Sequence, residues 1–281
     1  MHALVIGAGA VGESAALHLR TAGWNVTATM RRDHADVAAR LEATGVRVAR
    51  FDLERDSIEV LLSPDVAAVV LTPILSLSVG AAPRLTKVQS VIAFSSNNVA
   101  IDPTALTYVK LAAAEAELCR HVPHATILRP TLIYGDPRLR TLPSIMRWAR
   151  ALPVLPVPGS GRALQQPVFY DDLGRAASSL AQSSAYAGTT FALGGPDVVS
   201  MRALFEAAAR AAGAKPLLMP TPRWALLFGA ALFGSRFPFD AAQIARVETD
   251  RVAGPQTPLP PELAPRTTLA DGLAKLAAAM R

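Results

Sequence analysis

The chain opens with Met1-His-Ala-Leu-Val-Ile-Gly-Ala-Gly-Ala-Val-Gly12, and this stretch decides the fold. The short apolar run at residues 3–6 predicts a buried strand. Glycines at positions 7, 9 and 12 follow directly, and residues 13–21 suit a helix. This order predicts the strand, tight turn and helix start that hold the pyrophosphate of a dinucleotide. A tight strand–helix turn that binds nothing is the alternative interpretation.

Each position of the turn has its own physical requirement. Gly7 permits the tight turn, Gly9 lets the backbone approach the phosphates, and Gly12 lets the helix pack against its strand. The first N–H groups of the helix lack partners within it, and they face the anion at the positive end of the helix dipole. We therefore expect the cofactor-binding turn to comprise Gly7, Gly9, Ala10, Val11 and Gly12.

The composition excludes several classes of protein. The 281 residues, 51% of them hydrophobic, can bury a large core in one compound domain or two lobes. Cys119 is the only cysteine, so no disulfide can form within the chain, which fits a reducing cytosol. The five histidines lack the spacing of metal ligands, and we expect no metal. The basic residues behind the net charge of +6 are dispersed, which argues against nucleic-acid binding.

Two features bear on location. The N-terminus lacks the charged region and cleavage site of a signal peptide, and we expect a cytoplasmic protein. The longest apolar stretch, residues 224–234, lies between Arg223 and Arg236 and is shorter than the roughly 20 residues that span a bilayer. A core or interface helix is the favoured interpretation, and a helix at the periphery of an acidic membrane is the alternative.

The first half of the chain alternates apolar runs with helical segments. Strands are predicted at 3–6, 25–30, 46–50, 66–71, 88–94 and 124–128, and helices near 11–22, 34–43, 54–62, 79–86 and 104–120. Continuously apolar strands such as 66–71 indicate burial on both faces, as in a parallel sheet covered by helices. The alternation predicts an α/β fold of the Rossmann type, a doubly wound parallel sheet with helices on both faces.

Beyond residue 130 the pattern loosens. Prolines and glycines at 153–161 predict a loop, and five prolines at 254–265 predict an extended surface segment. Strands are predicted at 166–169, 189–193 and 216–219, and helices at 170–182, 200–212, 222–233 and 268–279. We expect a dinucleotide-binding core over residues 1–160, with further core elements from 161–195. Residues 196–281 are expected to form a smaller, mixed C-terminal lobe that binds substrate.

An ordered set of motifs carries a resemblance to a known family. After the glycine turn come Phe51-Asp52-Leu53, Ala93-Phe94-Ser95-Ser96, Lys110-Leu-Ala-Ala-Ala-Glu115, Leu128-Arg-Pro-Thr-Leu-Ile-Tyr-Gly135, Pro167-Val-Phe-Tyr-Asp-Asp172 and Leu193-Gly-Gly-Pro196. Over residues 1–235 the chain resembles the extended or atypical short-chain dehydrogenases/reductases. This NAD(P)-binding group includes nucleotide-sugar epimerases, dehydratases and reductases. The stretch from Phe191 to Trp224 is similar to the NADPH-binding accessory subunit of respiratory complex I.

The resemblance implies further cofactor contacts. Asp52, followed by Leu53, matches the family residue beside the adenine, and capping of the next helix is an alternative role. Thr72-Pro73 stands where the family has a pair of small residues beside the ribose. Lys110 matches the lysine that binds the nicotinamide ribose, with a solvated helix lysine as the alternative. Pro130 belongs to the same set of cofactor contacts.

The residues after the second strand bear on the choice of nicotinamide cofactor. NAD-binding proteins usually place an acid there, whereas this chain has Arg31-Arg32. Two guanidinium groups suit the 2′-phosphate of NADP, so NADP is favoured and NAD is the second choice. The alternatives are solvated arginines before a helix capped by Asp33, or Asp33 itself reaching a ribose.

The catalytic pattern of the family is incomplete. The family pairs tyrosine with lysine four residues later on one helix face, but Leu106 stands four residues before Lys110. Tyr108 is roughly 200° from Lys110 around a helix and cannot share its face. Ser96 matches the residue that binds the substrate oxygen, with backbone capping as the alternative. Tyr134 matches a tyrosine that packs near the nicotinamide, and it is a candidate substitute acid.

Two functions follow from this pattern. The first is reversible hydride transfer at a carbinol or ketone carbon of a small molecule, anionic or a nucleotide sugar. The second is a non-catalytic NADP(H)-binding protein with a structural, assembly or sensing role. We expect a monomer or a homodimer.

Overall fold

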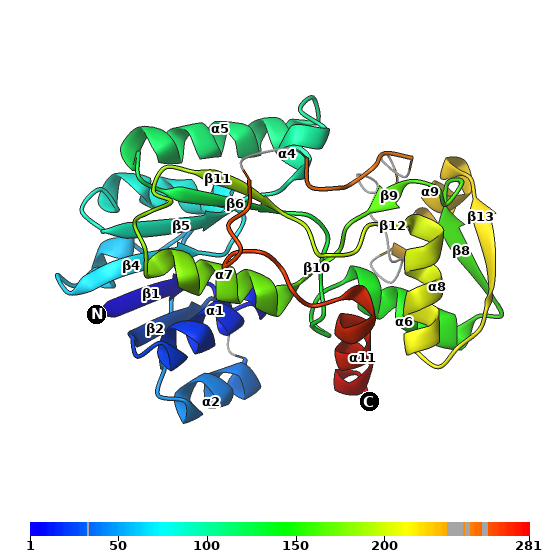
Figure 1. Ribbon diagram of the computed structural model, residues 1–281, viewed down its shortest axis with the longest axis horizontal. Helices are drawn as coiled ribbons and strands as arrows, with labels where there is room; N and C mark the ends of the chain where they lie inside the picture. Colours follow the sequence, from blue (N-terminus) through cyan, green and yellow to red (C-terminus); the bar gives the residue numbers. More distant parts are fainter. Residues whose placement is uncertain (33, 235–243, 245–247, 255–257) are drawn as a thin grey trace. The chain divides into compact units, whose positions relative to one another are not determined.

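The structure is a computed structural model that describes the whole chain except residues 33, 235–243, 245–247 and 255–257 (Figure 1). The chain forms two compact units. Unit one comprises Met1–Pro130, Tyr170–Leu193 and Ala253–Pro265, and unit two comprises Thr131–Phe169, Gly194–Val252 and Arg266–Arg281. The domain boundary that we placed at residue 160 from the sequence stays a prediction.

Unit one is built on a parallel seven-stranded sheet in the order β11-β6-β5-β4-β1-β2-β3. The strands are β1 (His2–Ile6), β2 (Asn25–Met30), β3 (Arg47–Arg50), β4 (Val66–Leu71), β5 (Ser90–Phe94), β6 (Thr126–Pro130) and β11 (Thr190–Leu193). The chain winds outward from β1 to β3 and then returns to the other side of β1 with β4. The predicted doubly wound α/β fold is confirmed, and its switch point lies between β1 and β4.

Helices of unit one surround this sheet (Figure 1). They are α1 (Ala10–Thr21), α2 (Ala35–Ala43), α3 (Leu75–Ser78), α4 (Asn98–Ile101), α5 (Leu106–His121) and α7 (Tyr170–Ala181). Helix α1 packs tightly on α7, where the Ser14 hydroxyl donates to Asp171 Oδ1 at 2.6 Å. The predicted helices at 54–62 and 79–86 contain only the 3₁₀ segments Ile58–Val60 and Val79–Arg84. Pro83 lies inside the second segment, and a proline interrupts regular helical hydrogen bonding.

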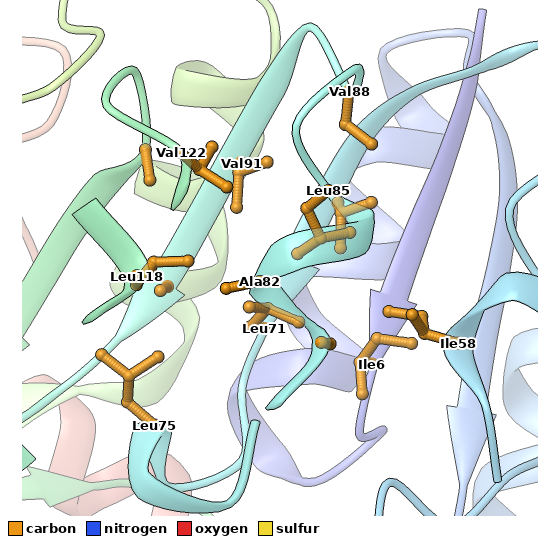
Figure 2. Close-up of a cluster of buried hydrophobic side chains, with 14 of the residues drawn as sticks. Ile6, Ile58, Leu71, Leu75, Ala82, Leu85, Val88, Val91, Leu118 and Val122 are labelled. Atoms are coloured by element: carbon orange, nitrogen blue, oxygen red, sulfur yellow. The ribbon is translucent and has the colours of Figure 1, made fainter. Parts of the chain in front are cut away.

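A cluster of buried aliphatic side chains lies between the sheet and the segments that cover this face, namely α3, α5 and the 3₁₀ segments Ile58–Val60 and Val79–Arg84 (Figure 2). Ile6, Leu71 and Val91 come from three neighbouring strands, and Leu118 comes from α5. The intervening strand residues are buried too, because helices cover both faces of the sheet. This explains why the strands read as continuously apolar in the sequence.

Unit two contains short strands and four longer helices among its described residues. They are β7 (Ile133–Tyr134), β8 (Val154–Pro158), β9 (Leu164–Gln165), β10 (Val168–Phe169), β12 (Val199–Ser200), β13 (Leu217–Thr221), α6 (Thr141–Ala151), α8 (Met201–Ala211), α9 (Arg223–Phe233) and α11 (Leu269–Ala279). The segment predicted as a loop at 153–161 contains β8, which pairs in parallel with β13. Proline has no backbone N–H to donate to a neighbouring strand. It is tolerated in β8 because one edge of each strand in a two-stranded sheet has no neighbouring strand to bond.

Helix α9 exposes much of its apolar surface. Trp224, Phe228 and Leu232, spaced four residues apart, are 73%, 68% and 66% exposed. Leu226 on the same helix is buried. The exposed stripe disfavours the interpretation of a core helix, while the interface and membrane-periphery alternatives stay predictions. Among the described residues, no helix is long and apolar enough to cross a membrane.

Candidate functional site

The glycine turn between β1 and α1 has the geometry that its three glycines require. Gly7 has a φ of +88°, which lies in the left-handed region that favours glycine. A Cβ on Gly12 would lie 2.0 Å from the carbonyl oxygen of Gly7, so only glycine fits there. A Cβ on Gly9 would meet nothing within 4 Å. Packing therefore does not require glycine at position 9, and the predicted close approach of phosphates to Gly9 stays a prediction.

Two threonines hold the turn from the neighbouring strands. Thr29 on β2 accepts hydrogen bonds from Gly7 N at its hydroxyl (3.0 Å) and from Ala8 N at its carbonyl (2.7 Å). The Thr72 hydroxyl, at the end of β4, lies 2.9 Å from the carbonyl oxygen of Ile6 and 2.5 Å from that of Gly7. The structure gives Thr72 a supporting role in the turn, and its predicted contact with the cofactor stays a prediction. Thr29 was not predicted as a site residue, although a threonine near the end of a mostly buried strand could have indicated it.

The N-terminus of α1 offers backbone donors next to the turn. Gly9 is the N-cap residue and supplies no side-chain cap. The amide of Glu13 makes an intrahelical bond to the carbonyl of Gly9 at 2.8 Å. The amides of Ala10, Val11 and Gly12 precede it, in the first turn where N–H groups have no intrahelical acceptor. Such a helix end attracts an anion.

A cleft of about 180 Å³ lies beside this turn within unit one. It gathers five predicted site residues from four segments: Gly7, Arg31, Asp52, Leu53 and Pro73. Thr29, Phe51 and Glu54 line it too and were not predicted as site residues. Its walls thus combine an apolar surface with both positive and negative side chains at the carboxyl ends of β1, β2 and β3.

Asp52 organises the turn that follows β3. Its Oδ1 accepts a hydrogen bond from Glu54 N at 3.1 Å, and its own amide donates to Asp56 Oδ2 at 2.7 Å. The predicted helix after Leu53 does not begin there, so Asp52 caps a turn and not a helix. Its position in the cleft leaves the role beside an adenine as a prediction.

Arg31 and Glu54 form an ion pair at the same cleft. Arg31 Nη1 lies 3.2 Å from Glu54 Oε2, and the two side chains are 53% and 50% exposed. Arg32 is exposed. Asp33 lies outside the described residues, and α2 begins at Ala35 after His34. At this end of β2, Arg31 is thus a cation that already has an anionic neighbour.

The end of β5 holds Ser96, the predicted partner of a substrate oxygen. Its hydroxyl accepts a hydrogen bond from the amide of Asn98 at 3.2 Å, which is the local capping alternative. The carbonyl of Pro130, at the end of β6, accepts from the amide of Asn97 at 3.0 Å. Ser96 and Pro130 therefore lie at the carboxyl ends of adjacent strands.

A cluster of buried charged side chains lies next to the end of β5, and it was not predicted from the sequence. Glu115 on α5 accepts hydrogen bonds from the Ser95 hydroxyl and from Arg129 on β6, whose Nε lies 3.0 Å from Glu115 Oε1. The Glu115 side chain is only 7% exposed. Burial, and then the charge of Glu115, raise the pKa of the nearby Cys119 thiol above its usual value. The cluster ties α5 to the sheet close to the predicted site.

Helix α5 presents Leu106 and Lys110 on an exposed surface. Leu106 is 69% exposed, and Lys110, one turn later, is exposed as well. Tyr108 packs against the buried cluster of Figure 2, and its hydroxyl accepts a hydrogen bond from Asn98 Nδ2 at 2.9 Å. Tyr108 and Lys110 thus lie on different faces, as the helical spacing predicts.

Tyr134 lies in the core of unit two. Its hydroxyl donates to the carbonyl oxygen of Thr268 at 3.1 Å, and its ring meets Phe169 edge-on at 5.6 Å. A Cβ on Gly272 of α11 would lie 2.3 Å from the Tyr134 hydroxyl oxygen, so the two are in close contact. These contacts describe a packing residue and lend no support to the predicted role as a substitute acid.

Comparison with known proteins identifies the fold. The sequence matches no family model and no curated protein. UDP-glucuronic acid 4-epimerase from Bacillus cereus, solved with UDP-glucuronic acid and NAD, is 14% identical, with 100% of this chain and 99% of that chain covered and a TM-score of 0.69. dTDP-glucose 4,6-dehydratase from Bacillus anthracis, solved with NAD, is 13% identical, with 99% and 96% covered and a TM-score of 0.73.

A third solved structure binds the other nicotinamide cofactor. Triphenylmethane reductase from Citrobacter, solved with NADP(H), is 16% identical, with 89% of each chain covered and a TM-score of 0.68. The chain therefore has the fold of NAD(P)-binding epimerases, dehydratases and reductases, and the resemblance noted in the sequence is confirmed at the level of the fold.

Proposed function

We propose that this protein binds a nicotinamide dinucleotide, NADP(H) in preference to NAD(H), and transfers hydride at a carbinol or ketone carbon. The observation that carries the proposal is the glycine turn, in which Gly9 has open space above a helix N-terminus. The proposal is supported by the backbone donors, the cleft and its cation, which lie together in unit one.

Each predicted residue has a defined part in binding. The amides of Ala10, Val11 and Gly12 would face the pyrophosphate, because a helix N-terminus favours negative charge. Arg31 and Arg32 would pair with the 2′-phosphate, and Asp52 with Leu53 would lie beside the adenine. When bound, the cofactor supplies or accepts a hydride at its nicotinamide ring.

Lys110 and Ser96 would act at the reacting end. Lys110 would hold the nicotinamide ribose, and Ser96 would donate a hydrogen bond to the substrate oxygen. Because Leu106 cannot supply a proton, we propose that proton exchange with the substrate uses a group other than the phenol of the family pattern.

The substrate is proposed to be a small anionic molecule, with nucleotide sugars first among the candidates. The Bacillus cereus epimerase binds UDP-glucuronic acid, and its fold spans the whole of this chain. The net charge of +6 also favours an anionic ligand. These points support the class of substrate and not a particular member.

The test is turnover by the purified chain. NADPH is incubated with ketones and nucleotide sugars, and its oxidation and the substrate's conversion are followed. We expect turnover of at least one substrate. Lys110→Ala should reduce it on the order of a hundredfold with no change in the unfolding midpoint, because Lys110 is exposed. Bound NADPH without turnover across a broad panel would contradict the catalytic proposal.

A non-catalytic NADP(H)-binding protein is the second candidate, and Leu106 is the observation that favours it. An exposed leucine stands on the face of α5 where the family has its phenol. In this case the dinucleotide would serve structure, assembly or sensing. A measurable reaction that Lys110→Ala abolishes would rule this candidate out.

A further inference from the structure

The ion pair between Arg31 and Glu54 lies where the cofactors would differ. Arg31 follows β2, and Glu54 lies in the turn after β3, the next strand of the sheet. Both side chains line the cleft beside the glycine turn, and their charged atoms are 3.2 Å apart. Each is about half exposed, so the pair can open without unfolding its surroundings.

We propose that Glu54 is a specificity-determining residue that weakens the selection of NADP over NAD by occupying Arg31. The inference rests on the proposed function, since it concerns the same cleft. It assigns to Glu54 a role opposite to that of the two arginines.

Glu54 and the 2′-phosphate of NADP would compete for one cation, the guanidinium of Arg31. A phosphate monoester carries a charge of about −1.5 to −2 and is a strong acceptor for a guanidinium group. A 2′-phosphate that binds Arg31 either displaces the carboxylate of Glu54 from Nη1 or shares the guanidinium with it, and in both cases Glu54 remains in the same cleft as a repelling charge. NAD has a hydroxyl in place of this phosphate, so its binding leaves the ion pair intact. Glu54 therefore disfavours NADP selectively.

The position of Glu54 is set by its own turn. Asp52 Oδ1 accepts the hydrogen bond from the amide of Glu54, which holds the backbone of Glu54 beside the cleft. The carboxylate of Asp52 is engaged by this contact and is 25% exposed, whereas that of Glu54 reaches Arg31. Glu54 is thus the carboxylate of this turn that competes for Arg31.

The test is calorimetric titration of the full chain with NADP⁺ and NAD⁺ at low salt. We expect Glu54→Gln to tighten NADP⁺ binding about fivefold and to change NAD⁺ binding less than about twofold, in line with the strength of exposed ion pairs. Glu59→Gln is the matched control. It removes an ion pair of similar exposure, with Arg84 at 3.1 Å, whose residues do not line this cleft.

A double-mutant cycle shows whether Glu54 acts through Arg31. In an Arg31→Gln background, Glu54→Gln should change the ratio of the two affinities less than about twofold. An unchanged ratio in the single Glu54→Gln variant, or an equal change with and without Arg31, would overturn the inference. A wild-type chain that binds neither dinucleotide would instead contradict the proposed function itself.

Discussion

At the scale of single residues, two glycines of the turn can be tested separately, because the fold requires glycine at position 12 and does not require it at position 9. Gly12→Ala would place a Cβ 2.0 Å from the Gly7 carbonyl oxygen, so the helix must shift from its strand. We expect this variant to lose about 1–3 kcal/mol of unfolding free energy, the usual cost of overpacking. Urea unfolding measures the loss, and a stability equal to wild type would contradict the close contact.

Gly9→Ala tests binding without disturbing packing. Its Cβ would meet nothing within 4 Å, so we expect the unfolding free energy to stay within about 1 kcal/mol of wild type. The added methyl group would occupy the space next to the helix N-terminus, and dinucleotide affinity should fall about tenfold or more, equivalent to about 1.4 kcal/mol. Unchanged affinity in this variant would show that no phosphate approaches Gly9.

The pKa of the Cys119 thiol should depend on the buried carboxylate of Glu115. Its pKa is raised by burial and then by Glu115, so less thiolate forms at a given pH than in the unfolded chain. Modification by a thiol reagent should therefore be slower in the native protein, and its pH midpoint should lie higher than in urea. Glu115→Gln should lower that midpoint. Equal pH profiles of thiol modification in the native and the urea-unfolded protein would contradict the raised pKa of Cys119.

At the scale of elements, the two faces of α5 should have different effects on turnover. Tyr108→Phe removes a hydroxyl that is bonded to Asn98 on the core side of the helix. If the protein catalyses hydride transfer, kcat should change less than about twofold, whereas loss of a general acid costs about 10²-fold or more. A hundredfold loss in steady-state kcat would identify Tyr108 as the missing acid and overturn the helical-face argument.

The ion pair between α5 and β6 should be important for stability. Glu115→Ala leaves Arg129 without its buried carboxylate, and we expect a loss of about 3 kcal/mol in urea unfolding. Glu117→Ala on the same helix is the control, because its pair with Arg120 is exposed to solvent and should contribute much less to stability than the buried pair. Equal losses in the two variants would show that the Glu115 cluster is no stronger than a surface pair.

At the scale of the whole molecule, the sheet was predictable because its strands are short, continuously apolar and separated by helical segments. The predicted bounds of β2 and β4 match the structure. Helix α6 was not predicted from the sequence, and β8 was taken for a loop because of its prolines. Their pairing and packing depend on residues far away in the chain.

The candidate site also combines residues that local sequence predicts with residues that only the fold brings together. The glycines and Arg31 were predicted because each belongs to a short local motif, whose geometry needs no distant partner. Thr29, Glu54 and Glu115 were missed because their partners come from other strands and helices, which only the fold brings near. Local motifs thus identify candidate ligand-binding residues, while the structure adds neighbours such as Thr29 and Glu54 that come from other strands and turns.

The central claim is that the turn after β1 binds the pyrophosphate of a nicotinamide dinucleotide. Calorimetric titration of the purified full chain with NADP⁺, alongside Gly9→Ala, tests it most directly. We predict saturable binding of one equivalent by the wild-type chain and a loss of about tenfold or more in affinity for the variant. No binding of NADP⁺ or NAD⁺ by a folded wild-type chain would contradict the claim.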